Sequence, residues 1–241
     1  ELTDCQLHDL PDGIGQLQNL ARLLVGKNRM VQLPETIREL QALTQLDLSE
    51  NYFNELPASI GDLHQLERLD ITGNNLEQLP VAICKAAQLN FIAASHNRLT
   101  ELSTEIGQLG LLHDLYLAGN KLKALPESFN QLQQLRWLDL SDNQFSEIPK
   151  SIEGLRSLEI LSLNGNSFTQ LSIDLGSMGR LRELSLPILS GKSLDTLIQQ
   201  LRAMPQMRRL RLIGSVLPSE SDREAIVQRL PGIKVEFVAG K

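Results

Sequence analysis

Residues 135–149 read LRWLDLSDNQFSEIP, and the same spacing of apolar residues around one asparagine occurs 23 residues earlier, as LHDLYLAGNKLKALP at 112–126. Apolar residues stand eight, five and three positions before the asparagine, as Leu135, Leu138 and Leu140 do before Asn143. The last two are separated by a single residue, which is the period of a β-strand with one buried face. The stretch therefore predicts a short strand followed by a turn.

The asparagine marks a repeat that runs through most of the chain. It recurs in a fixed step of 23 residues at Asn28, Asn51, Asn74, Asn97, Asn120, Asn143 and Asn166. An apolar residue follows five positions later, usually with a proline after it, in a segment too short for a full α-helix. One unit cannot bury its leucines alone, so the units must stack. We expect the asparagines to form a ladder that satisfies backbone groups of adjacent repeats.

These units resemble a known family. The stretches LDLSENYFNELPASIGDLHQ at 46–65 and LDLSDNQFSEIPKSIEGLRS at 138–157 resemble the leucine-rich repeats of Ras-suppressor and LAP-type scaffolds, Roco GTPases, plant intracellular proteins and bacterial repeat proteins. The resemblance implies an α/β repeat fold, a right-handed horseshoe-shaped solenoid with a concave parallel β-sheet and short turns or 3-10 helices on its convex side. It also implies that the concave sheet is the usual contact surface.

The repeat pattern predicts a single domain over residues 1–241. A partial first repeat covers 1–19, regular repeats cover 20–189, and longer helical repeats that form a cap cover 190–241. Leu189 occupies an asparagine position, and the following steps of 26 and 23 residues lead to Ser215 and Val238. Apolar spacing predicts two helices, after Ser190 and over Ser219–Leu230. The pattern gives ten strands in total.

Composition and motifs exclude several classes of function. A net charge of −6 argues against neutralising the phosphates of a nucleic acid. The cysteines, Cys5 and Cys84, and the four histidines have no metal-ligand spacing, and no phosphate-binding loop or GxSxG motif occurs. We therefore expect no enzyme activity, no metal and no cofactor. No apolar run approaches the roughly 20 residues that span a bilayer.

The low cysteine content also bears on location. The chain has no cysteine-rich caps and no Asn-x-Ser/Thr sequon. These features favour a cytoplasmic protein, with a secreted or cell-surface bacterial protein as the alternative. Separately, we expect a monomer.

Function should lie in the outward positions of the strands, six and four residues before each asparagine. Large apolar side chains occupy such positions on four consecutive repeats, at Phe91, Tyr116, Trp137 and Ile160. Exposed aromatic residues of this kind are candidate binding hot spots. Charged residues surround them at Arg68, Asp70, Asp114 and Asp139, which suggests a partner with basic residues beside an apolar anchor. The alternatives are scattered surface aromatics and charges that serve solubility.

A second candidate surface lies near the C-terminus. Residues 180–241 hold eleven Lys and Arg against six Asp and Glu. Arg182, Arg209, Arg211 and Lys234 fall on the predicted strands and could hold an acidic partner segment or an anion. The alternative is a solvated face or pairing within the chain.

The sequence thus predicts a non-catalytic protein–protein interaction module or scaffold that binds another protein on the concave sheet. Two alternatives stay open. One is a regulatory or targeting segment of a larger signalling enzyme or bacterial effector, and the other is a secreted or surface bacterial binding protein.

Overall fold

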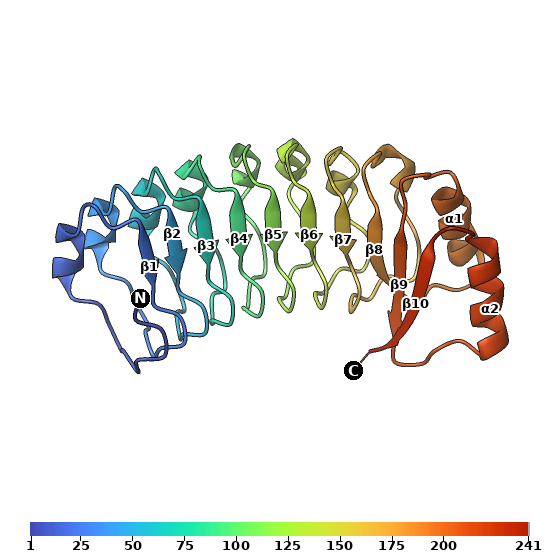
Figure 1. Cartoon of the computed structure of the whole chain (residues 1–241), viewed down its shortest axis with the longest axis horizontal. Helices are drawn as coiled ribbons and strands as arrows, with labels where there is room; N and C mark the ends of the chain where they lie inside the picture. Colours follow the sequence, from blue (N-terminus) through green and yellow to red (C-terminus); the bar gives the residue numbers. More distant parts are fainter. Residues whose placement is uncertain (241) are drawn as a thin grey trace.

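The computed structural model describes residues 1–240 and contains one open parallel sheet of ten strands, in the order in which they occur along the chain. The strands are β1 Arg22–Leu24, β2 Gln45–Asp47, β3 Arg68–Asp70, β4 Phe91–Ala93, β5 Asp114–Tyr116, β6 Trp137–Asp139, β7 Ile160–Ser162, β8 Glu183–Pro187, β9 Arg209–Gly214 and β10 Lys234–Ala239. Figure 1 shows the repeats stacked in a row with the two termini at opposite ends. The solenoid and its ten strands are confirmed.

The register of the sheet follows the repeat step. From β1 to β8 each residue pairs with the one 23 positions later, so that Phe91, Asp114, Trp137 and Ile160 form one row across four strands. The middle residue of each three-residue strand is buried, and the first and third point outward. We call the surface formed by these outward side chains the strand face.

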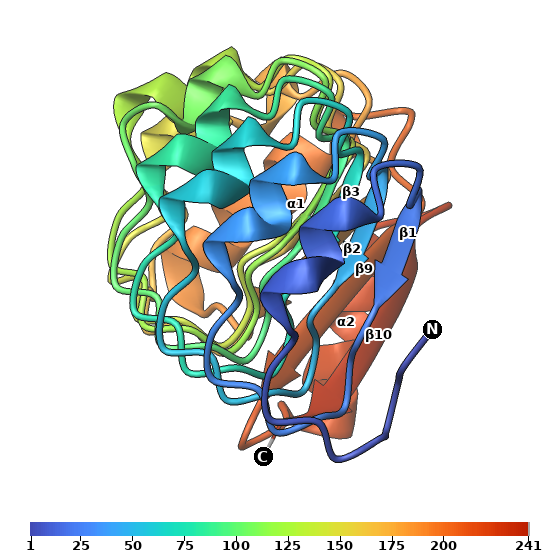
Figure 2. The same cartoon turned by 90° about the vertical axis from the view of Figure 1, so that its left-hand side faces the viewer.

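Short 3-10 helices line the side of the solenoid away from the strands, as the end-on view in Figure 2 shows. They are η1 Asp12–Gln16, η2 Glu35–Glu39, η3 Ala58–Asp62, η4 Val81–Lys85, η5 Ile106–Gln108, η6 Glu127–Gln131, η7 Lys150–Ile152 and η8 Leu175–Ser177. In six of them the residue before the helix is a proline, with φ between −60° and −68°. The proline ring fixes the angle at which the chain enters the turn.

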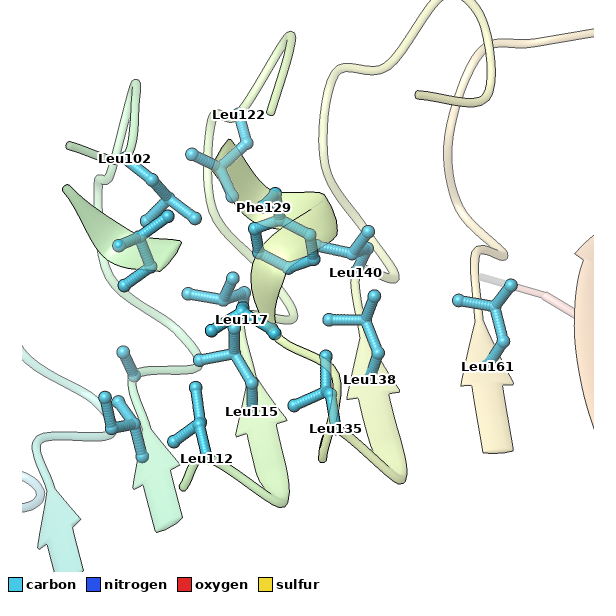
Figure 3. Close-up of a cluster of buried hydrophobic side chains, with 14 of the residues drawn as sticks. Leu102, Leu112, Leu115, Leu117, Leu122, Phe129, Leu135, Leu138, Leu140 and Leu161 are labelled. Carbon is cyan, nitrogen blue, oxygen red and sulfur yellow. The ribbon is translucent and has the colours of Figure 1, made fainter. Parts of the chain in front are cut away.

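The core is one elongated aliphatic interior between the strands and the 3-10 helices. Figure 3 shows Leu115 and Leu138 pointing from their strands into this interior, where Phe129 of η6 meets them from the opposite side. These three side chains are almost fully buried. The layers fit closely, since a Cβ atom at Gly61 would lie 2.2 Å from the carbonyl oxygen of Ala82. Side chains larger than hydrogen are therefore excluded at this point of the helical layer.

Asparagine side chains join each repeat to the one before it. The Nδ2 atom of Asn97 donates to the carbonyl oxygens of Ile71 at 2.9 Å and Ala94 at 3.1 Å, and its Oδ1 accepts from the backbone N–H of Leu76 at 3.0 Å. Equivalent bonds recur at all seven positions, beginning at Asn28, whose Oδ1 accepts from the N–H groups of Cys5 and Leu7. Buried backbone groups of two neighbouring turns are thus satisfied by one amide.

The residue before each of these asparagines adopts the left-handed conformation, which the sequence pattern did not predict. The seven residues have φ between 50° and 70° and are Lys27, Glu50, Gly73, His96, Gly119, Asp142 and Gly165. Four of them are not glycine and adopt a backbone region that costs energy for L-residues. The ladder requires this turn whatever side chain stands there.

Beyond Asn166 the architecture changes. Leu189, which replaces the asparagine, is buried in the core, and the helices α1 Gly191–Arg202 and α2 Glu220–Arg229 replace the 3-10 turns. The side chain of Gln200 on α1 accepts from the N–H of Leu175 at 2.9 Å and donates to the carbonyl of Ile173 at 3.1 Å. These bonds attach the helical end to the regular repeats.

The predicted register of the last repeat is wrong by two residues. Val235, not Ile233, lies beside Leu210, and the step from β9 to β10 is therefore 25 residues. A shift of two residues keeps the same side chains on the buried face, so periodicity cannot detect it. The shift places Lys234 beside Arg209 and Glu236 beside Arg211.

The ladder leads to a first prediction. We expect Asn97→Ala to lower the free energy of unfolding by about 1–3 kcal/mol, because three buried backbone groups lose their partner. Urea denaturation followed by circular dichroism measures the change. Asn54→Ala, at an exposed loop position, should have little effect. Equal effects of the two substitutions would show that the ladder does not stabilise the fold.

Candidate functional site

Three aromatic rings on consecutive strands form a continuous contact on the strand face. The ring centroids of Phe91 and Tyr116 lie 5.5 Å apart with an interplanar angle of 48°, and those of Tyr116 and Trp137 lie 5.5 Å apart at 50°. Tilted pairs at this separation are favourable. We call Phe91, Tyr116 and Trp137 the aromatic ridge. Trp137 is 39% exposed, and Ile160 continues the row beside it on β7.

Arg68 on β3 packs against the Phe91 end of the ridge. Its guanidinium carbon lies 3.9 Å from the centroid of the Phe91 ring, within the range of a cation–π interaction. The structure therefore brings Arg68, Phe91, Tyr116, Trp137 and Ile160 together on adjacent strands. Their part in binding a partner stays a prediction.

Two of the predicted site aspartates have a structural role that the sequence analysis missed. Oδ1 of Asp70 accepts from the backbone N–H of Thr72 at 3.0 Å. Oδ1 of Asp139 accepts from the N–H and the hydroxyl of Ser141 at 2.9 and 2.6 Å. Each carboxylate caps the turn after its strand, as Asp47 also does. The signal was present, because Asp-x-Ser and Asp-x-Thr spacing is typical of such turns.

Asp114 differs from the other aspartates of the strand face. It lies in the row between Phe91 and Trp137, and its side chain enters no hydrogen bond or ion pair with any residue in the range 1–240. The residue is half-buried, and its carboxylate caps no turn, unlike those of Asp70 and Asp139. Among the aspartates beside the aromatic ridge, Asp114 is therefore the one whose carboxylate has no partner within residues 1–240.

Burial and negative charge together perturb the titration of the ridge. Burial raises the pKa of the Tyr116 phenol above its usual value, and the charges of Asp114 and Asp139 raise it further. Burial likewise raises the pKa of Asp70, while hydrogen bonds from Thr72 act in the opposite direction. The centre of the strand face is thus a partly desolvated surface of negative potential.

The predicted basic patch near the C-terminus is already paired within the chain. Ion pairs join Arg182 to Glu159 at 2.6 Å and Arg209 to Glu183 at 3.0 Å. Glu236 accepts from Arg211 at 2.9 Å and from Lys234 at 2.5 Å, and these contacts lower its pKa to about 2. Each basic residue thus has a glutamate beside it, which agrees with the alternative of pairing within the chain. We propose no anion site there.

Other candidate chemistry has no geometric support in the described part of the chain. Cys84 is buried, and burial with the nearby charge of Glu105 raises the pKa of its thiol to about 11, so little thiolate forms near neutral pH. Residues 1–240 contain no group of three His, Cys, Asp or Glu placed to hold a metal ion. Over the same range, every helix is too short or too polar to cross a membrane.

Comparison with known families gives the same assignment as the repeat geometry. A family profile described as a leucine-rich repeat region matches residues 82–230, and a second, described as a leucine rich repeat, matches residues 18–76. The chain is a leucine-rich-repeat protein. No curated protein sequence matches it. The leucine-rich-repeat fold is generally a protein-interaction module and is typically non-enzymatic.

Solved structures share the solenoid. A leucine-rich-repeat protein of Leptospira interrogans is 27% identical with a TM-score of 0.73; the match covers 98% of this chain and 64% of that protein. The ectodomain of the Arabidopsis thaliana receptor kinase GASSHO1/SCHENGEN3, solved with CASPARIAN STRIP INTEGRITY FACTOR 2, is 25% identical (TM-score 0.62; 97% of this chain, 29% of that one). An internalin of Listeria monocytogenes shares the fold alone. It is 18% identical with a TM-score of 0.63, and the match covers 98% of this chain and 78% of that protein. This leucine-rich-repeat chain thus spans less than two thirds of the Leptospira protein.

The perturbed phenol gives a second prediction. In a Tyr52→Phe variant, Tyr116 is the only tyrosine, so the phenolate absorbance near 295 nm reports its titration. We expect a midpoint above pH 10, and a lower midpoint when Asp114→Asn removes one negative charge. Circular dichroism checks that the fold persists at each pH. A midpoint at or below pH 10 would contradict the described environment of the ridge.

Proposed function

We propose that this leucine-rich-repeat protein is a non-catalytic interaction module that binds a partner protein on its strand face, with the aromatic ridge as the central contact. The observation that supports this most is Trp137, the only tryptophan of the chain, held partly exposed against Tyr116 at the middle of the sheet. Tryptophan and tyrosine are enriched among the few residues that carry most of the binding energy of protein interfaces.

The position of the ridge suits binding in two ways. Its three strands are paired on both sides, so the backbone below the rings is rigid before a partner arrives. Aromatic side chains also have few rotatable bonds, which limits the entropy lost on binding. The rings span two strand spacings, about 10 Å. A stable interface of roughly 800 Å² on each partner would therefore extend onto neighbouring strands.

A second candidate is a recognition segment within a larger signalling protein. The Arabidopsis structure supports it, because that ectodomain belongs to a membrane receptor kinase and this chain covers 29% of it. The strand face would still carry out the binding, and the ridge would remain its central contact. Both candidates place the same residues at the interface.

The third prediction tests the ridge directly. We expect the double variant Tyr116→Ala, Trp137→Ala to lose binding to its protein partner by more than tenfold, while thermal stability changes by no more than about 1 kcal/mol, as is typical of surface sites. Capture from a lysate of the source organism, followed by quantitative mass spectrometry, identifies the proteins that wild type retains and the variant does not. Affinity for a purified partner is then measured by calorimetry.

Tyr52→Ala is the matched control, because Tyr52 is an exposed aromatic residue outside the ridge, at 54% exposure. It should bind the partner as wild type does. If the double variant retains every specifically captured protein at wild-type affinity, the ridge is not the contact surface and the proposal fails.

A further inference from the structure

The chain itself shows how a cation sits on the ridge. The guanidinium group of Arg68 lies over the ring of Phe91 at 3.9 Å. At the other end of the ridge, the neighbour of Trp137 in the same row is Ile160, which carries no charge. Within residues 1–240 no cation lies over the indole of Trp137, although tryptophan is the strongest cation–π partner among the aromatic side chains.

Negative charge surrounds this free indole. Asp114 lies beside Trp137 on the adjacent strand, about 4.8 Å away along the sheet, and Asp139 follows two residues later on the same face of β6. The outward positions of β2 to β6 hold four aspartates against one arginine. Burial raises the pKa of Tyr116 most, and the charges of Asp114 and Asp139 raise it further, while Arg68 acts in the opposite direction.

The absence of a counter-ion distinguishes Asp114 from the glutamates of the strand face. Glu183 and Glu236 each have an arginine within ion-pair distance, whereas Asp114 has none in the described residues. Its carboxylate and the indole of Trp137 together offer both elements of a cation site. A partner would have to supply the missing positive group.

We propose that the ridge binds an arginine side chain of the partner, stacked on Trp137 and paired with the carboxylate of Asp114. The planar guanidinium group can stack on a ring while its N–H groups donate to a carboxylate. A lysine ammonium group is a compact, strongly hydrated point charge and fits this arrangement less well. The inference rests on the proposed function and names the partner chemistry that the strand face selects: a basic segment with apolar neighbours, which Ile160 and Tyr116 would contact.

The test uses a defined probe. A fluorescein-labelled peptide with blocked ends and the sequence Leu-Arg-Leu-Arg-Leu is titrated with the whole chain, and binding is followed by fluorescence anisotropy. Parallel titrations use two further peptides. In one, lysine replaces both arginines, and in the other, citrulline, an uncharged isostere of arginine, replaces them. We expect the order arginine, lysine, citrulline, and weaker binding of the arginine peptide as salt rises from about 50 to 500 mM.

Variants assign the binding to the two named groups. Asp114→Asn should weaken binding of the arginine peptide about fivefold and leave binding of the citrulline peptide unchanged. Asp9→Asn, an exposed substitution with the same change in net charge, controls for long-range electrostatics and should have no effect. Trp137→Ala should weaken binding of the arginine peptide by more than tenfold.

Three results of the peptide titrations would overturn the inference: no binding of the arginine peptide up to about 1 mM, equal binding of the citrulline peptide, or no effect of Asp114→Asn. Specific, Trp137-dependent binding of a neutral glycan on an array would overturn it too, because a sugar ring can also stack on an indole. These results are separate from those of the partner capture. If the double variant Tyr116→Ala, Trp137→Ala loses its partner while the arginine peptide does not bind, the proposed interaction module is retained. Only the inference of an arginine side chain on Trp137 is then wrong.

Discussion

Buried backbone groups at each turn impose the constraint on which the rest of this structure depends. The chain leaves the sheet every 23 residues through a turn packed between two others, where water cannot satisfy its carbonyl and N–H groups. One asparagine amide satisfies groups of its own turn and of the preceding one, as Asn97 does for Ala94, Ile71 and Leu76. An amide has both donors and an acceptor, and few side chains could replace it. The ladder therefore holds the regular repeats in the same register.

The constant register creates the strand face. Residues 23 positions apart lie side by side, so Phe91, Asp114 and Trp137 share a row although they are far apart in sequence. Tyr116 lies in the neighbouring row and touches both rings. Strands β4 to β6, which carry the aromatic ridge, are each paired on both sides, and core leucines lie beneath them. Function on this fold is therefore a matter of which side chains occupy the outward positions.

The ladder ends where the fold changes. After Asn166 an apolar residue, Leu189, occupies the asparagine position, and helices α1 and α2 replace the 3-10 turns. The strands lengthen, and outward charges of both signs form ion pairs across β8 to β10, as in the contacts of Arg209 with Glu183 and Glu236. Charges that neutralise one another leave little field for an incoming ligand. The carboxylates around the aromatic ridge have few such counter-ions, and the two halves of the strand face consequently differ in what they can attract.

The sequence by itself determined the solenoid, its ten strands, the buried face and the neighbourhood of Phe91, Tyr116 and Trp137, because a fixed step and a period of two translate directly into register and orientation. It could not give the left-handed turn before each asparagine, where Lys27 and Gly165 have the same conformation but no chemistry in common. Only the tertiary structure decided which charged side chains form ion pairs within the chain. Whether Arg211 is free depends on Glu236 lying beside it, and a two-residue change in the last register, invisible to periodicity, places it there.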